Sequence, residues 1–151
     1  MIGTTKTISS IKFWLSATAY IIASLAAFLL TSGGYTFLFF VIVMGAFYLI
    51  AWLFVVITCS IDSKVRYTPI LIYLILFVQT IAILFNFSDS GYYGSTCAKN
   101  FIQHFLNSTS CGTLWLGSNT YNWVIVSYIA VVLIFAIDIV RSGPIFDKNS
   151  K

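Results

Sequence analysis

The feature that most constrains this chain is a set of four long apolar runs that contain almost no charge. They cover residues 13–31, 35–60, 68–87 and 121–140. A helix of about 20 apolar residues crosses the roughly 30 Å hydrocarbon core of a bilayer. Only 8% of the chain is charged, whereas soluble domains average about 25%. The sequence therefore predicts an all-α integral membrane protein, an antiparallel four-helix transmembrane bundle formed by one domain over residues 1–151.

The connections between these runs support alternating helices. Ser32-Gly33-Gly34 is long enough only for a tight turn, so the first two helices should be antiparallel. Pro69 suits the first turn of the third helix. A cleaved signal peptide would also begin with a basic segment, but its apolar region is usually about 7–15 residues. The first run has 19 residues, and we expect it to remain as a helix.

Basic residues are distributed unevenly between the two sides that four spans create. Seven of the eight lie on the side of both termini and the second connection, and only Lys99 lies on the other. Because cytosolic segments carry an excess of Lys and Arg, we expect both termini to be cytosolic. The protein would then be a multi-pass protein of the eukaryotic secretory pathway or plasma membrane, with residues 88–120 as a lumenal or extracellular loop. The seven residues are Lys6, Lys12, Lys64, Arg66, Arg141, Lys148 and Lys151.

Two features of the loop at 88–120 agree with a lumenal placement. Cys97 and Cys111 can form a disulfide, which persists only in an oxidising compartment. Asn107-Ser108-Thr109 is an acceptor for N-linked sugar. The alternatives for the cysteines are free thiols or a bond between molecules. Asn86-Phe87-Ser88 also fits the acceptor pattern, but it abuts the membrane and should stay unmodified.

The segment between the two loop cysteines has helical periodicity. Phe101, Ile102, Phe105 and Leu106 fall on one helical face, which predicts a short amphipathic helix on the membrane or on the helix ends. His104 lies in the same segment, and no further ligands converge on it as a metal or haem site requires.

Polar residues inside the apolar runs are candidates for specific contacts. Gln79 interrupts the third run, and a buried amide usually bonds to a neighbouring helix; a substrate contact is the alternative. Asp138 lies near the end of the fourth run, where Arg141 at i+3 could form a local ion pair or the carboxylate could reach water. A contact to a partner subunit or a proton-linked role is the alternative for Asp138. Cys59 ends the second run and is either a palmitoylation candidate or an unmodified buried thiol.

Small residues and aromatic residues are also patterned along the runs. A small-residue stripe on the first helix would allow another helix to approach closely, although chance explains it equally well. It consists of Ser16, Ala19, Ala23 and Ala27. Most Trp residues and several Tyr residues fall near the predicted span ends, which is typical of an aromatic belt. These are Trp14, Trp52, Trp115, Trp123, Tyr35, Tyr67, Tyr121 and Tyr128.

Several classes of function lack the residues that they need. The sequence contains no Gly-rich phosphate loop, no Ser/His/Asp set, no acid pair and no Cys-x-x-Cys motif. The formal charge of +4 is scattered and forms no basic patch, so we expect no nucleic-acid partner. We also expect no cofactor, no metal and no enzymatic activity.

The predicted topology resembles that of the MARVEL-type four-span membrane proteins. The likeness rests on cytosolic termini, a very short first lumenal turn at Ser32–Gly34, and a longer second loop that holds a cysteine pair. The last span, residues 126–141, is similar in texture to the fourth span of the proteolipid branch, which also ends in a basic residue. The pattern of claudin-like proteins fits less well, because the first loop here is too short to hold their cysteine pair. The tetraspanin pattern also fits less well, because the Cys-Cys-Gly motif is absent. The resemblance implies a role in membrane microdomains, vesicle trafficking or membrane apposition.

These observations predict a non-enzymatic scaffold that organises membranes or aids vesicle trafficking. It would act by lateral association with lipids and with other membrane proteins or copies of itself. The alternative is an accessory subunit of a larger channel, transporter or membrane enzyme. A transporter in its own right is less favoured, since one peripheral acid offers no polar path across the membrane.

Overall fold

The computed structural model describes residues 5–61, 63–89, 99–106 and 118–142. Most of these residues are helical, as the sequence predicts. Within them, three helical stretches are long and apolar enough to cross a membrane: Ser10–Thr31, Phe37–Ile61 and Thr120–Arg141. The long helices are α1 (Ser10–Thr31), α3 (Gly45–Ile61), α4 (Pro69–Leu84) and α6 (Ser118–Arg141).

The third predicted span is shorter than the sequence suggests. α4 has 16 residues, which corresponds to about 24 Å at 1.5 Å per residue. It begins at Pro69, as expected, but ends before the predicted limit at residue 87. Phe85 leaves the helical conformation at φ −99° and ψ 8°, and the Asn86 carbonyl then accepts a hydrogen bond from the Phe101 amide. The observed structure thus has three full-length candidate spans and one shorter apolar helix.

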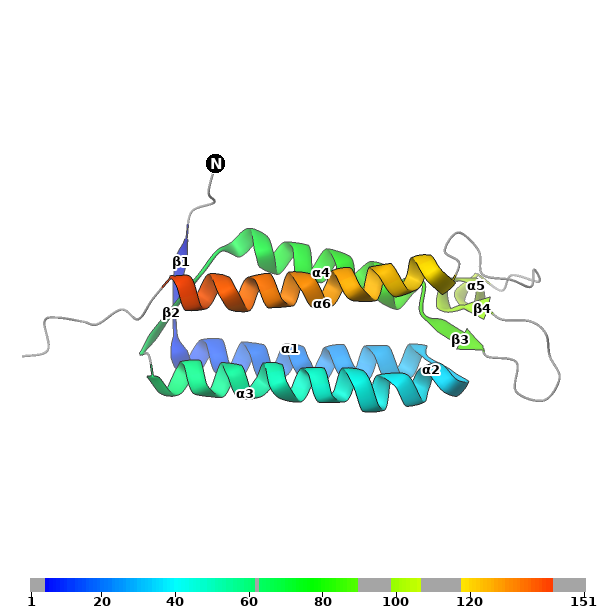
Figure 1. Ribbon diagram of the computed structural model, residues 1–151, viewed down its shortest axis with the longest axis horizontal. Helices are drawn as coiled ribbons and strands as arrows, with labels where there is room; N and C mark the ends of the chain where they lie inside the picture. The colour runs from blue at the N-terminus through cyan, green and yellow to red at the C-terminus, as the bar shows by residue number, and fades with distance from the viewer. Residues whose placement is uncertain (1–4, 62, 90–98, 107–117, 143–151) are drawn as a thin grey trace, which may run out of the picture.

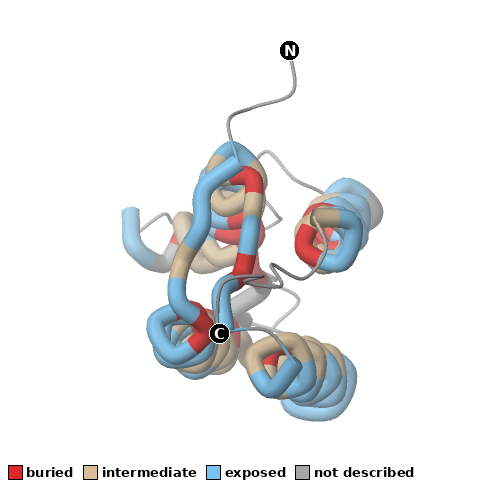
Figure 2. The backbone as a smooth tube through the Cα atoms, turned by 90° about the vertical axis from the view of Figure 1, so that its left-hand side faces the viewer, coloured by how far each residue is buried: buried red, intermediate tan, exposed pale blue. Residues whose placement is uncertain are grey.

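The four long helices run side by side and alternate in direction (Figure 1). α1 packs along α3, and α4 packs along α6. A view along the bundle shows buried positions on the inward helix faces and exposed positions on the outward faces (Figure 2). The exposed positions include many large apolar side chains, as expected of a bundle that lipid surrounds.

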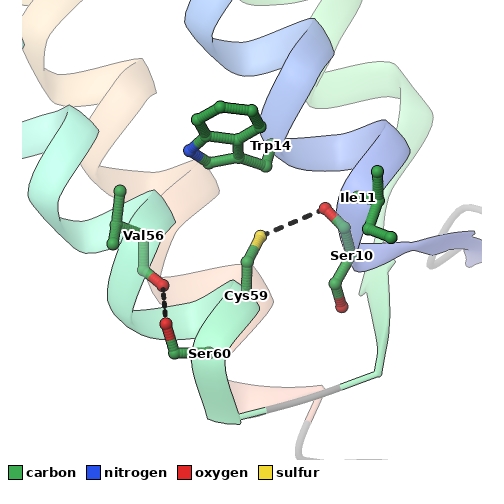
Figure 3. A pocket seen from close by; sticks show the side chains of 6 residues that line it. All are labelled: Ser10, Ile11, Trp14, Val56, Cys59 and Ser60. Atoms are coloured by element: carbon green, nitrogen blue, oxygen red, sulfur yellow. Dashed lines mark hydrogen bonds between the residues drawn. The ribbon is translucent and has the colours of Figure 1, made fainter.

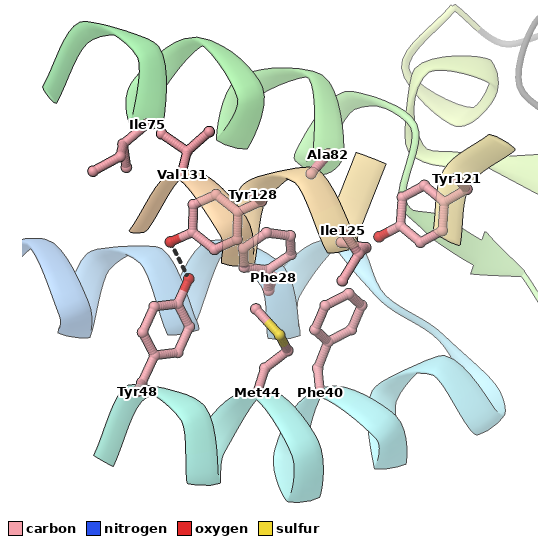
Figure 4. Packing of buried hydrophobic residues seen from close by; sticks show 10 residues of the cluster. All are labelled: Phe28, Phe40, Met44, Tyr48, Ile75, Ala82, Tyr121, Ile125, Tyr128 and Val131. Atoms are coloured by element: carbon pink, nitrogen blue, oxygen red, sulfur yellow. Dashed lines mark hydrogen bonds between the residues drawn. The ribbon is translucent and has the colours of Figure 1, made fainter. Parts of the chain in front are cut away.

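The apolar core lies where all four helices meet. Phe28, Phe40, Met44 and Tyr128 are fully buried, and they converge from α1, from the second helical stretch and from α6 (Figure 4). The Phe28 and Phe40 rings stack with centroids 4.8 Å apart. Ala82 on α4 is also fully buried, and its small side chain lets α4 approach the other helices.

A π-helical turn interrupts the second helical stretch. α2 (Gly34–Phe39) leads into η1 (Phe40–Met44), which continues into α3. The buried residues Phe40, Met44 and Tyr48 are four apart, and in a regular α-helix each such step overshoots a full turn by about 40°. A wider π turn reduces this drift, so all three side chains face the core.

A small antiparallel sheet that the sequence does not predict closes one end of the bundle. β1 (Lys6–Ser9) pairs with β2 (Lys64–Tyr67). Ile8 lies opposite Val65, and Val65 is buried against the helices. Lys64 and Arg66 alternate with Val65 and remain exposed. We call this end the basic end and the opposite end the loop end.

The loop end is built from short elements that follow α4. β3 (Phe87–Asp89) pairs with β4 (Lys99–Asn100), and α5 (Phe101–Phe105) follows directly. Asn100 and Gln103 form a capping box: each side-chain oxygen accepts the other residue's backbone N–H, at 3.1 and 2.9 Å. The short helix expected between the loop cysteines is therefore present, but Phe105 and Leu106 are exposed while Gln103 is buried.

Candidate functional site

The most distinctive internal feature is a layer of polar side chains halfway along the bundle. Tyr20 and Ser24 come from α1, Tyr48 from α3, Gln79 from α4 and Tyr128 from α6. Four of the five are buried, and Tyr20 is half-buried. We call this set the tyrosine layer. Each side chain extends from a different turn or helix to the same depth, so polar atoms meet in an apolar surrounding.

The hydrogen-bond directions in the tyrosine layer follow from counting hydrogens, because each hydroxyl has one. Tyr20 donates to Gln79 Oε1 at 2.6 Å. The 2.8 Å contact between Tyr20 and Tyr128 must then use the Tyr128 hydrogen. Tyr48 consequently donates to Tyr128 at 2.8 Å, and Ser24 donates to Tyr48. Gln79 Nε2 donates to Ser24 Oγ, which closes a ring.

This ring links all four long helices by a closed set of hydrogen bonds. Figure 4 shows one bond of this ring, between the hydroxyl groups of Tyr48 and Tyr128. Hydrogen bonds between membrane helices average about 0.6 kcal/mol and reach about 1.7 kcal/mol, and a closed ring polarises its members cooperatively. The ring begins and ends at Gln79, so it forms no path from one end of the bundle to the other.

A second polar layer lies at the loop end and centres on Asn86. Its side chain is fully buried. The amide nitrogen donates to the Phe28 carbonyl at 3.1 Å and to Thr31 Oγ1 at 3.0 Å, while Oδ1 accepts from the Tyr121 hydroxyl at 2.8 Å. Asn86 therefore ties α4 to α1 and α6. Its amide nitrogen is buried and hydrogen-bonded, which gives a second reason to expect that this acceptor pattern stays unmodified.

A third polar contact lies at the basic end, between Asp138 on α6 and Thr68 before α4. The carboxylate accepts from the Thr68 backbone N–H at 2.9 Å and from its hydroxyl at 3.1 Å. An acid near a helix N-terminus satisfies an unpaired N–H and complements the helix dipole. The expected local pair with Arg141 is thus replaced: in the described part of the chain Asp138 forms no ion pair with Arg141, because the carboxylate turns inward to cap α4.

The sequence candidates on the first three helices occupy different environments. Gln79 bonds through both amide atoms to α1, as described above. Ser16, Ala19 and Ala23 of the small-residue stripe are exposed, and Ala27 is half-buried. The stripe therefore lies mostly on the outward face of α1 and contributes little to packing within the chain. Association of this stripe with another helix remains a prediction.

Cys59 lines a shallow depression between α1 and α3 at the basic end (Figure 3). Its Sγ donates to the Ser10 carbonyl at 3.3 Å. The space measures about 220 Å³ and is bordered by Ile11, Trp14 and Val56 in addition to serine residues. Cys59 is half-buried. Its acylation remains a prediction.

The remaining sequence candidates lie outside what the structure describes. Cys97, Cys111 and Asn107 fall in the ranges 90–98 and 107–117, so the proposed disulfide and sugar site stay predictions. His104 belongs to α5, but its side chain is not described. Among the described residues there is no group of three or more His, Cys, Asp or Glu that could hold a metal ion.

Sequence reasoning missed the tyrosine layer by assigning tyrosines to the membrane interfaces. Tyr128 and Tyr121 were expected in an aromatic belt, but both are buried in the bundle, at 0% and 4% exposure. A signal was available: Tyr20, Tyr48, Gln79 and Tyr128 lie near the middle of four different runs. Polar atoms at one depth in several apolar helices indicate an internal contact, since lipid offers them no partner.

Comparisons with known proteins found no family model, curated protein or solved structure that matches the chain.

Proposed function

We propose that this chain is a four-span membrane scaffold that organises membranes or aids vesicle trafficking without catalytic turnover. It would act by lateral association with lipids and with other membrane proteins or copies of itself. The observation that carries the proposal is that the buried polar atoms are hydrogen-bonded within the bundle. No buried side-chain nitrogen or oxygen in the described residues lacks a hydrogen-bond partner. The hydrogen bonds of the tyrosine layer form a closed ring.

The fourth span of this proposal is α4. Helix ends in lipid require their backbone groups to be satisfied within the protein. α4 meets this condition at its start, where Asp138 accepts the Thr68 N–H and Pro69 lacks an N–H. At its end, Phe85 and Asn86 donate their backbone N–H groups to α4 carbonyls. A short span is accommodated by local thinning of the bilayer at modest cost.

The orientation proposed from the sequence agrees with the grouping of cations in space. Lys6, Lys64 and Arg66 lie on the basic-end sheet, and Arg141 ends α6 beside it. Lys99 is the one described Lys or Arg at the loop end. We therefore infer a cytosolic basic end and a lumenal or extracellular loop end, where a Cys97–Cys111 disulfide and a sugar on Asn107 would form.

The resemblance to MARVEL-type proteins favours the same role, and the outward faces provide the surfaces it needs. Large apolar side chains are exposed along α1, α3, α4 and α6. These outward faces are what a neighbouring lipid or helix meets.

One observation favours the alternative, an accessory subunit of a larger membrane complex. In the part of the chain that the structure describes, the stripe of Ser16, Ala19 and Ala23 is exposed and faces outward. Small residues at such spacing let a second helix approach closely. A partner helix seated there would make the chain one component of a fixed assembly.

Extraction in a mild detergent followed by mass spectrometry of the intact assembly separates the two functions. A scaffold should appear as monomers and homo-oligomers, whereas an accessory subunit should carry a larger partner at fixed stoichiometry. Ala23→Leu should disrupt association through the stripe, and Ala130→Leu, on the exposed face of α6, serves as the matched control. A stoichiometric heteromeric partner that Ala23→Leu releases would overturn the scaffold proposal.

A further inference from the structure

A groove between α3 and α6 opens to the outside of the bundle in its basic half. It has a volume of about 450 Å³ and is lined by Phe54, Leu133, Ala136, Ile137, Val140 and Arg141. Sites for small molecules commonly span about 300–1,000 Å³ and are mainly apolar with a few polar groups. Five apolar side chains line this groove, and Arg141 borders the end that would meet the membrane interface, so that the lining surface itself is almost wholly apolar.

Arg141 is the charged residue that borders this groove. The carboxylate of Asp138, one turn away on the same helix, accepts two hydrogen bonds from Thr68 on the inward side. In the part of the chain that the structure describes, Arg141 forms no ion pair, and its side chain is exposed. The C-terminus of α6 offers no free N–H groups to an anion, so among the residues that line the groove Arg141 is the one that can bind an anion.

We propose that this groove binds one acidic glycerophospholipid, with its phosphate on Arg141 and an acyl chain along Leu133 and Ile137. A guanidinium matches phosphate oxygens through two parallel hydrogen bonds, and basic pockets between membrane helices hold acidic lipid headgroups. The groove supplies the apolar part of the ligand site below that charge. The inference rests on the proposed membrane function and names the class of lipid that the groove between α3 and α6 would bind.

The depression beside Cys59 shows why Arg141 matters to this assignment. That depression also lies between two helices at the basic end, but its lining contains no cation. The two spaces therefore differ in charge: serine residues line one of them together with apolar surface, and Arg141 borders the other, whose lining is almost wholly apolar.

The test measures lipids that stay bound when the protein is released from nanodiscs into the gas phase. Nanodiscs contain equal amounts of phosphatidylglycerol and phosphatidylcholine, and the mass spectrum counts each lipid retained. The wild type should retain one phosphatidylglycerol in preference to phosphatidylcholine. Arg141→Gln should lower this preference about fivefold, the effect of one basic residue at an anionic surface. Arg141→Lys should restore part of it, because charge returns without the planar fork.

Two further variants separate the groove from general surface charge. Arg66→Gln removes an exposed cation at the same end but outside the groove lining, and it should leave the preference unchanged. Ile137→Trp should obstruct the acyl chain and reduce retention of both lipids at this site. The proposal is overturned if Arg141→Gln keeps the wild-type preference, or if Arg66→Gln lowers it equally.

The same spectra distinguish failure of this inference from failure of the proposed function. A protein that inserts, self-associates and shows no lipid preference would contradict the groove assignment alone. A protein that does not insert into nanodiscs, or that always carries a stoichiometric partner, would contradict the scaffold proposal itself.

Discussion

The middle and the basic end of the bundle use polar residues in opposite ways. In the tyrosine layer, uncharged side chains from α1, α3, α4 and α6 bond only to one another. At the basic end, Lys64, Arg66 and Arg141 are charged and exposed, while the Asp138 carboxylate turns inward to Thr68. The difference reflects the solvent expected at each depth. Lipid cannot satisfy a hydroxyl, so hydroxyls pair internally, whereas interfacial water and headgroups can satisfy a cation.

The largest expected loss of stability comes from the loop-end layer. Asn86→Leu removes a fully buried amide that joins α4 to α1 and α6. We expect a loss of about 3 kcal/mol in the free energy of unfolding, since buried polar groups cost about 1–3 kcal/mol each when a partner is lost. Unfolding in mixed detergent micelles measures this change. Asn122→Leu, exposed on α6, is the control and should change little.

The inward carboxylate at the basic end should matter next. Asp138→Ala removes the cap of α4, and the loss of a helix cap costs about 0.5–2 kcal/mol. Asp138→Asn keeps an oxygen that can accept the Thr68 N–H, so it should retain most of the stability. Equal losses in the two variants would show that charge, rather than the cap geometry, is what stabilises this end.

The tyrosine layer predicts non-additive losses of moderate size. Tyr128→Phe and Gln79→Leu each open the same ring, so combining them should cost about 1 kcal/mol less than the sum of the separate losses. Thr18→Val removes the acceptor of the Trp52 indole N–H, which lies outside the ring. Its loss should add to that of Tyr128→Phe, and additivity in both pairs would show that the ring is not cooperative.

The smallest effect on stability should come from the exposed cations. Lys64→Gln and Arg66→Gln together should leave the unfolding midpoint unchanged within error, because both residues are exposed on the outer face of β2. They should instead increase the fraction of molecules inserted in the opposite orientation. Accessibility of an introduced tag at either terminus measures that fraction. A marked loss of stability would mean that these cations hold the basic-end sheet together.

The sequence predicts the helices well and their contacts poorly. Apolar runs locate α1, α3 and α6 because lipid demands uninterrupted apolar surface, and Pro69 marks the start of α4. β1 was missed because its pairing partner lies at Lys64–Tyr67, far along the chain. The end of α4 was also misplaced, since the Asn86 carbonyl is directed to Phe101 by contacts distant in sequence.

By itself, the sequence determined that most of the chain is apolar helix and that the described Lys and Arg residues other than Lys99 lie at one end of the bundle. Both properties depend on residue type along the chain, because transfer into lipid acts on each segment almost independently. Only the tertiary structure decided that Tyr128 faces inward, that Asp138 caps α4, and that Ser16, Ala19 and Ala23 face outward. Those outcomes depend on which helix faces lie together, and the rotation of each helix is set by all of its neighbours at once.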